Sequence, residues 1–162
     1  MALHTARMAE LNVPSEAYLV ASRFLDRCQE NPADPSRYKY KPTYPVDREQ
    51  RLSMTASGLL ARQWLGWPHH LAAMRLGANY LLSEEERPDW DNGRRNVYGW
   101  YYQAGALHNM GGESWKEWFA VANRSWSRTS RRPGRIAEAG TPRGRRGVGT
   151  STRTSAVVCM SP

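Results

Sequence analysis

Residues 54–67 have the sequence MTASGLLARQWLGW and predict a helix that ends in a tight turn. Apolar side chains recur through this stretch at helical spacing, and Gly66 stands where a left-handed glycine commonly ends a helix. Pro68 follows at a position suited to the first turn of a new helix, which the pattern predicts over residues 69–82. The stretch therefore predicts an αα-hairpin, two helices joined by a short connection.

A similar helical pair is predicted on each side of this hairpin. In the first pair, residues 1–11 form one helix, and Ser15 is the expected N-cap of the next. That second helix carries an apolar stripe of Leu19, Val20, Phe24, Leu25 and Cys28. In the third pair, a helix from about Asn96 to Met110 is followed by one that restarts at Glu113.

The turns of the three pairs lie 54 and 45 residues apart, within the range of stacked structural repeats. Single αα-hairpins cannot bury their apolar faces alone, so neighbouring hairpins must stack. The sequence therefore predicts an all-α fold class of three stacked αα-hairpins, over about residues 1–29, 54–82 and 96–123. Between the first two, residues 31–52 contain four prolines and no sustained period, which predicts a long loop.

The N-terminus and the cysteines exclude several protein classes. The N-terminus lacks the apolar run of a secretory signal peptide, and no segment approaches the roughly 18 apolar residues of a membrane span. The chain therefore shows no visible cellular address. Its two cysteines, Cys28 and Cys159, lie far apart, so no disulfide framework or metal knuckle is predicted. Cys28 is expected to be a packed thiol on a helix.

The charge of the chain changes abruptly near residue 124. Residues 1–122 contain 14 basic and 14 acidic side chains, whereas residues 123–162 contain nine arginines and one acid, Glu138. The whole formal charge of +8 therefore sits in the last 40 residues. This segment has almost no large apolar side chain, so burial could not offset the entropy cost of ordering it. We expect a folded domain over residues 1–123 and a disordered Arg-rich tail over residues 124–162.

Three stretches of the predicted folded domain resemble a known family. They are MTASGLLARQWLGW at residues 54–67, GANYLL at residues 77–82 and NVYGWYYQAGALHNMGGESWKEW at residues 96–118. They are similar to the repeats of squalene cyclase-like and prenyltransferase-type α/α toroids, above all to bacterial proteins with prenyltransferase and squalene oxidase repeats. The resemblance covers about residues 1–122 and implies that the three hairpins form a partial α/α toroid. It also implies about half of a full ring, and hence a fragment of a longer parent.

The resemblance implies catalytic groups that the chain lacks. Cyclases of this kind use an Asp-x-Asp-Asp motif to protonate an alkene, whereas only Asp89-Trp90-Asp91 comes near it here, in a polar loop predicted to be a solvated turn. Protein prenyltransferases hold zinc with Asp, Cys and His, and no such trio occurs in matching context. We therefore predict no catalytic residue, no metal and no cofactor. A non-catalytic structural or interaction role is favoured, with a cyclase-like enzyme acting on an isoprenoid substrate as the alternative.

Aromatic residues on the helix that begins near Asn96 are the best candidates for a ligand-lining surface. Tyr98, Tyr101 and Tyr102 lie within two turns, where residues three or four apart share a face. Packing in the core is the alternative, since aromatic residues at helical spacing are commonly buried. His108 on the same helix could act as an acid or base, or could bond a backbone carbonyl.

The sequence predicts two kinds of partner. A stack of three hairpins would expose apolar faces at both ends, which favours self-association or a protein partner. The tail would bind nucleic acids weakly and without sequence preference, because clustered arginines contact phosphates. A further hypothesis is that the tail is a frameshift product, since its composition, rich in Arg, Gly and Pro and free of Lys, is typical of GC-rich DNA translated out of frame.

Overall fold

A computed structural model of the chain describes residues 1–83, 85–90 and 95–130. These residues form six helices and one two-stranded sheet. The elements in chain order are α1 Ala2–Met8, α2 Ser15–Arg27, β1 Gln29–Asn31, β2 Asp34–Tyr38, α3 Arg48–Trp64, α4 Ala72–Leu81, α5 Val97–Met110 and α6 Gly112–Ser130. None of the helices in this described part is long and apolar enough to cross a membrane.

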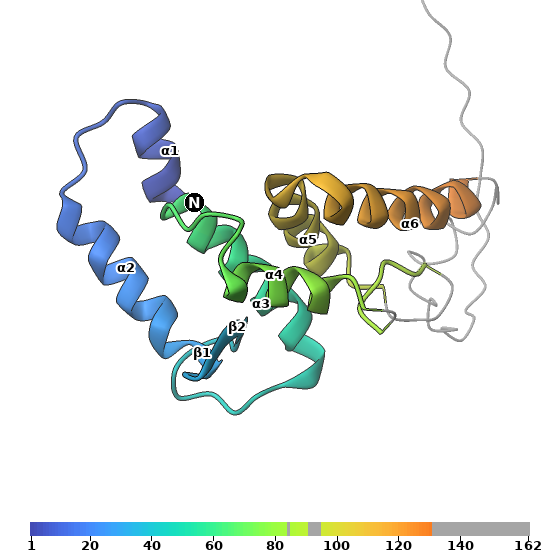
Figure 1. Cartoon of the computed structure of the whole chain (residues 1–162), viewed down its shortest axis with the longest axis horizontal. Coiled ribbons are helices and arrows are strands. Elements are labelled where there is room, and N and C mark those ends of the chain that lie inside the picture. Colours follow the sequence, from blue (N-terminus) through green and yellow to red (C-terminus); the bar gives the residue numbers. More distant parts are fainter. Residues whose placement is uncertain (84, 91–94, 131–162) are drawn as a thin grey trace, which may run out of the picture. The chain divides into compact units, whose positions relative to one another are not determined.

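Helix α3 is the element on which the others assemble (Figure 1). Helices α4 and α5 and strand β2 pack against α3, and α6 packs against α5. Apolar side chains at helical spacing on α3, including Ala56 and Leu59, are almost completely buried in this centre. Small residues let the neighbours approach closely. A Cβ atom on Gly58 would come within 2.4 Å of the Tyr38 ring, so a larger residue there would displace β2.

Strands β1 and β2 form an antiparallel hairpin inside the segment predicted to be a long loop. Side chains close its turn: Asn31 accepts a hydrogen bond from the Ala33 N–H at 2.9 Å, and Asp34 accepts one from the Ser36 N–H at 3.2 Å. Alternate residues Ser36 and Tyr38 are buried, in the period-two pattern of a strand. The predicted all-α fold class, with three stacked αα-hairpins forming a partial α/α toroid, is therefore wrong, because a β-hairpin covers α3 and α4.

Helix boundaries agree with the prediction best in the third pair. Helix α5 begins near Asn96, as predicted, and the structure shows Asn96 as its N-cap; Gly66 after α3 has the predicted left-handed conformation, with a φ of +96°. Helix α4 begins only at Ala72, because the residues before it form a turn. Ser15 is the first residue of α2 and not its N-cap, since Pro14 occupies the N-cap position.

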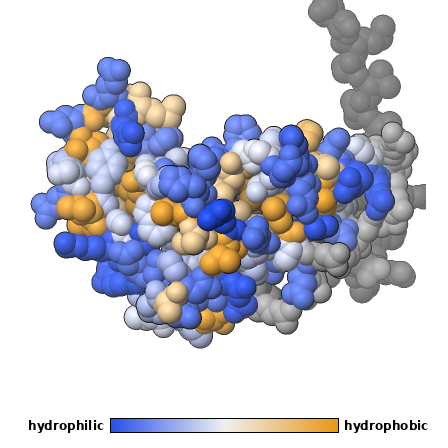
Figure 2. Space-filling model, viewed as in Figure 1, coloured by the Kyte–Doolittle hydropathy of each residue, from blue (hydrophilic) through white to orange (hydrophobic). Residues whose placement is uncertain are grey.

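The first helical pair differs from the predicted hairpin. We call residues 1–28 the N-terminal arm. Among the described side chains, none in α1 or α2 is buried. Leu25 and Cys28 of the predicted apolar stripe pack against the core, whereas Leu19, Val20 and Phe24 are exposed. Figure 2 accordingly shows hydrophobic side chains at the surface of the arm, among hydrophilic ones.

A buried arginine joins the arm to α3. The Arg62 side chain is 0% exposed; it donates from Nε to the Tyr38 hydroxyl at 3.1 Å, from Nη1 to the Ser22 hydroxyl at 2.9 Å, and from Nη2 to the Asp26 carboxylate. Its guanidinium carbon also lies 4.4 Å from the ring centre of Trp67. A buried charge needs such partners to offset its lost hydration. The inner face of α2 is therefore partly polar, which leaves much of its apolar stripe on the outside.

The predicted domain boundary at residue 123 lies inside α6, which continues to Ser130. Arg124 and Arg128 are thus exposed residues of a helix. The remaining part of the predicted disordered tail, residues 131–162, lies outside the described residues.

Candidate functional site

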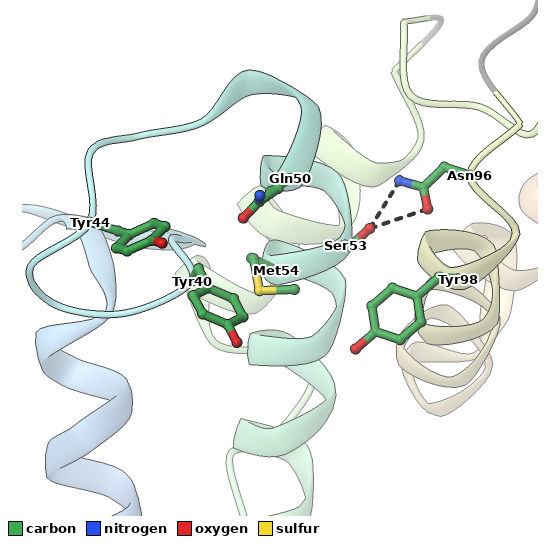
Figure 3. A pocket seen from close by; sticks show the side chains of 7 residues that line it. All are labelled: Tyr40, Tyr44, Gln50, Ser53, Met54, Asn96 and Tyr98. Carbon is green, nitrogen blue, oxygen red and sulfur yellow. Dashed lines mark hydrogen bonds between the residues drawn. The ribbon is translucent and has the colours of Figure 1, made fainter.

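An open cleft of about 690 Å³ lies between the loop after β2 and the N-terminal turns of α3 and α5. Figure 3 shows the rings of Tyr40 and Tyr98 on opposite sides of Met54, which belongs to α3. We call this site the tyrosine cleft. The described residues that line it are all uncharged types, namely Tyr40, Tyr44, Gln50, Ser53, Met54, Asn96 and Tyr98.

The first wall of the tyrosine cleft is the loop over residues 39–47. A hydrogen bond of 2.8 Å from the Lys39 N–H to the Cys28 carbonyl fixes its start, and one of 3.0 Å from the Tyr44 N–H to the Lys41 carbonyl closes a turn within it. The turn brings the Tyr40 and Tyr44 rings to a centroid distance of 5.6 Å. The Lys41 ammonium lies 4.4 Å from the Tyr44 ring centre, a cation–π contact.

Ser53 and Met54 of α3 form the floor of the cleft, and Tyr98 of α5 forms its second wall. The N-cap of α5 joins the floor to this wall. The Asn96 side chain accepts a hydrogen bond from the Gly99 N–H at 2.7 Å, which caps the helix. The same carboxamide donates to the Ser53 hydroxyl at 2.9 Å and so ties α5 to α3. A Cβ atom on Gly99 would come within 2.9 Å of the capping side chain, which explains the glycine. The cap therefore holds Tyr98 in place beside the floor.

The three predicted ligand-lining tyrosines are brought together. Tyr98 and Tyr101 are 58% and 62% exposed, so neither packs in the core, whereas Tyr102 is half-buried. The Tyr102 ring lies 4.9 Å from the Tyr98 ring and 5.2 Å from the Tyr101 ring, both edge to face. A side-chain hydrogen bond with Tyr98 is the main cause that raises the pKa of Tyr102 above its ordinary value. Tyr98 alone of the three lines the cleft; Tyr102 contacts its ring, whereas Tyr101 contacts Tyr102 only among these three.

His108, the fourth candidate, lies apart from the tyrosines. It is exposed near the C-terminal end of α5, and its ring makes an edge-to-face contact with Trp115 at 5.0 Å. It does not line the tyrosine cleft.

The sequence analysis missed the loop wall of the cleft. Tyr40 and Tyr44 occur in the proline-containing segment that was expected to be irregular, where no period marks a face. The available signal was the density of tyrosines between the prolines, at positions 38, 40 and 44. Met54 was expected only as the start of a helix, and Ser53 fell between the predicted loop and that helix, whereas α3 begins at Arg48.

The described lining of the cleft consists of aromatic and neutral polar side chains with one methionine. None of the described lining residues is an Asp, Glu, His, Lys, Arg or Cys, so the tyrosine and serine hydroxyls are the lining groups that could transfer a proton or act as a nucleophile. Among the residues that the structure describes, no three His, Cys, Asp or Glu side chains gather in a way that could hold a metal ion. Aromatic faces, hydroxyls and carboxamides instead offer stacking and neutral hydrogen bonds.

Comparisons with known proteins found no matching family, no matching curated protein and no matching solved structure. The resemblance to prenyltransferase and squalene oxidase repeats therefore stays a prediction.

Proposed function

We propose that this chain is a non-catalytic interaction module that binds an extended, uncharged, proline-rich segment of a partner protein in the tyrosine cleft. The observation that carries the proposal is the pair of exposed aromatic walls, Tyr40 with Tyr44 and Tyr98, across a floor whose described lining residues are uncharged. Tyrosine is enriched at protein interfaces because it combines a large apolar ring with a hydrogen-bonding hydroxyl.

The chemistry of the cleft supports a proline-rich occupant. Grooves lined by aromatic side chains recognise the polyproline II helix, whose preformed shape lowers the entropy cost of binding. Proline rings stack on tyrosine faces, and the carbonyls of a polyproline II segment lack internal hydrogen bonds, so tyrosine hydroxyls and the Gln50 carboxamide can donate to them. A phosphorylated or strongly charged ligand would find no countercharge among the lining residues.

Titration with an acetylated hexaproline peptide tests the proposal. We expect amide NMR shifts of the full chain to change around Tyr40, Ser53 and Tyr98, whereas a Gly/Ser peptide of equal length leaves them unchanged. Tyr98→Ala should weaken binding at least about tenfold, or about 1.4 kcal/mol, as loss of an aromatic anchor does. Tyr101→Ala is the matched control, since Tyr101 is equally exposed on the same helix but does not line the cleft.

Two outcomes would overturn this function. One is absence of shifts in the cleft at millimolar peptide while the chain is folded. The other is equal weakening by Tyr98→Ala and Tyr101→Ala, which would place binding outside the cleft. Selective binding of a neutral oligosaccharide in place of the peptide would also reject a protein partner.

The arginine-rich segment supports a separate prediction of weak, sequence-independent nucleic-acid binding. Seven of its nine arginines lie beyond Arg128, outside the described residues. Deleting residues 131–162 should abolish binding to duplex DNA, and log K for the full chain should fall by about 0.9 per neutralised phosphate as log salt concentration rises. Retained affinity in the shortened chain would assign the binding to the helical part. A cyclase-like activity, the other function open from the sequence, has no support in the lining of the cleft.

A further inference from the structure

Helix α2 has two unlike faces, and the outer face has no neighbour in the described part. Its inner face carries Ser22, Leu25 and Asp26 toward α3 and the core. The hydrogen bonds of Ser22 and Asp26 to the fully buried Arg62 fix the rotation of α2 about its own axis. A helix held by apolar contacts alone could roll, whereas directional bonds to a buried guanidinium hold one orientation.

The outer face combines apolar and charged side chains. Leu19 and Val20 are 56% and 58% exposed, whereas Phe24, at 43% exposed, lines a pocket with Leu3 and Trp64 on the side toward α1 and α3. Glu16, Arg23 and Arg27 share this face, since they are spaced i, i+7 and i+11 along the helix, and their side chains are exposed. Within the part of the chain that the structure describes, none of these three charged residues forms an ion pair.

The charges are segregated along the helix axis. The acid, Glu16, lies in the first turn, and the basic residues Arg23 and Arg27 lie in the last two turns, with the exposed apolar side chains between them. We propose that this outer face of α2 is an interface between two copies of the chain, which pair α2 against α2 in antiparallel orientation.

The charge order selects both the partner and its direction. A two-fold axis near the middle of α2, between residues 21 and 22, places Glu16 beside Arg27 of the second copy and brings the two Val20 side chains together at the axis. The Glu16–Arg27 contact then occurs twice, as an isologous interface requires. Parallel pairing would instead set acid against acid and arginine against arginine, which is unfavourable. The face is thus complementary to itself in one direction only.

The size of α2 sets the strength of this dimer. Thirteen helical residues span about 20 Å at about 1.5 Å per residue, so one helix pair buries less than a standard interface of about 1,600 Å². We therefore expect a reversible dimer that dissociates on dilution. This inference is independent of the tyrosine cleft.

Sedimentation equilibrium of the full chain, freed of nucleic acid, tests the dimer over a wide concentration range. Glu16→Arg should raise the dimer dissociation constant at least about tenfold, and R23E/R27E should do the same, because each variant places like charges together. The triple variant E16R/R23E/R27E should restore the wild-type constant to within about threefold, since it only reverses the order of the charges. Glu113→Arg, the same charge change at an exposed residue of α6, is the matched control and should leave it unchanged.

The charge reversals also distinguish antiparallel pairing of α2 from nonspecific hydrophobic association. A chain that stays monomeric at all concentrations overturns the proposal. So does a dimer that Leu19→Asp dissociates but that ignores the charge reversals, because its contacts would then not be those of antiparallel α2 helices. Helical circular dichroism of each variant shows whether it is folded, and the exposed positions of all the changed side chains make loss of the fold an unexpected result.

Discussion

The N-terminal arm and the core around α3 both contain amphipathic helices, yet their apolar side chains are buried to very different extents. In the core, Leu59, Met74 and Leu107 are almost completely removed from water. In the arm, no described side chain of α1 or α2 is buried, and Leu19 and Val20 are more than half exposed. The difference teaches that an apolar stripe is buried only where a matching apolar surface exists, and, toward α2, helix α3 presents the Arg62 guanidinium beside the apolar side chains of Trp64 and Leu65.

The two regions also differ in how polar groups are used. Gln103 in the core is fully buried, and its carboxamide accepts from the Trp118 indole at 3.0 Å and donates to the Glu86 carbonyl at 3.0 Å. This amide joins α5, α6 and the segment after α4. Arg62 plays the corresponding part between α3 and the arm, but its partner Asp26 is 54% exposed. The central amide of the core network is thus fully buried, whereas one member of the arm network, the Asp26 carboxylate, is about half exposed.

Truncating one leucine in each region gives the largest expected contrast. Leu59→Ala should lower the free energy of unfolding by about 2–5 kcal/mol, because it leaves a cavity between α3 and α4. Leu19→Ala should change it by at most about 0.5 kcal/mol, since the side chain is already in water. Urea unfolding at low protein concentration, where the chain is monomeric, measures both. Equal losses would mean that the arm is packed as tightly as the core.

Replacing Arg62 sharpens the comparison, because this residue joins the two regions. Arg62→Met keeps much of the aliphatic volume but removes the bonds to Tyr38, Ser22 and Asp26, and we expect a loss of about 2 kcal/mol in unfolding free energy. Amide hydrogen exchange in α2 should accelerate more than that in α5. Asp26→Asn should cost less than about 1 kcal/mol, since the half-exposed carboxylate is screened by water.

An unchanged exchange rate in α2 of the Arg62→Met protein would contradict this account. It would assign the attachment of the arm to the apolar contacts of Leu25 and Cys28 alone.

Local signals in the sequence predicted the parts of the fold that depend on neighbours along the chain. The period of Ala56, Leu59 and Leu60, the glycine turn at Gly66 and the helix start near Asn96 depend on residues close in sequence, and each prediction was confirmed. The β-hairpin was missed because the prolines near Asn31 hid the turn chemistry of the asparagine and aspartate side chains.

Tertiary contacts decided the rest. Periodicity locates the apolar side of α2 but does not say which side has a neighbour, so the exposure of Leu19 and Phe24 was not predictable from the arm alone. One signal was available: Arg62 follows Leu59 by three positions on the buried face of α3, which indicates a buried charge in need of partners. In the cleft, Tyr98 was predicted from a regular helix, whereas Tyr40 depends on how the loop returns to α3.

Removing the core amide is expected to have a smaller effect than removing Leu59. Gln103→Leu conserves the size of the side chain but leaves the Trp118 indole N–H buried without its acceptor, which should cost about 1–3 kcal/mol. Tryptophan fluorescence should shift as the indole loses that bond. Gln63→Leu is the control, because Gln63 is only partly buried and should change stability by less than about 1 kcal/mol. An equal loss of unfolding free energy at Gln63 would show that the fully buried Gln103 amide stabilises the chain no more than a partly buried amide does.

The smallest expected effect concerns alkaline pH and again separates core from arm. Burial, followed by the neighbouring Glu86 carboxylate, raises the pKa of the Tyr80 phenol above its ordinary 10.0, and burial raises the pKa of the Cys28 thiol above 9.0. Both groups are therefore neutral in the folded chain at a pH where the unfolded chain has begun to ionise. Their contribution to stability is complete below pH 9 and is lost as pH rises through 9 and then 10 toward the folded values.

Tyr80→Phe should lower stability by about 1 kcal/mol at pH 7, through loss of the 3.0 Å bond to Glu86, and should flatten the decline above pH 10. Urea unfolding of both proteins from pH 7 to 11 measures the two slopes. Parallel slopes would show that the pKa of the Tyr80 phenol is the same in the folded and the unfolded chain, and hence that the phenol is exposed to water in the folded chain.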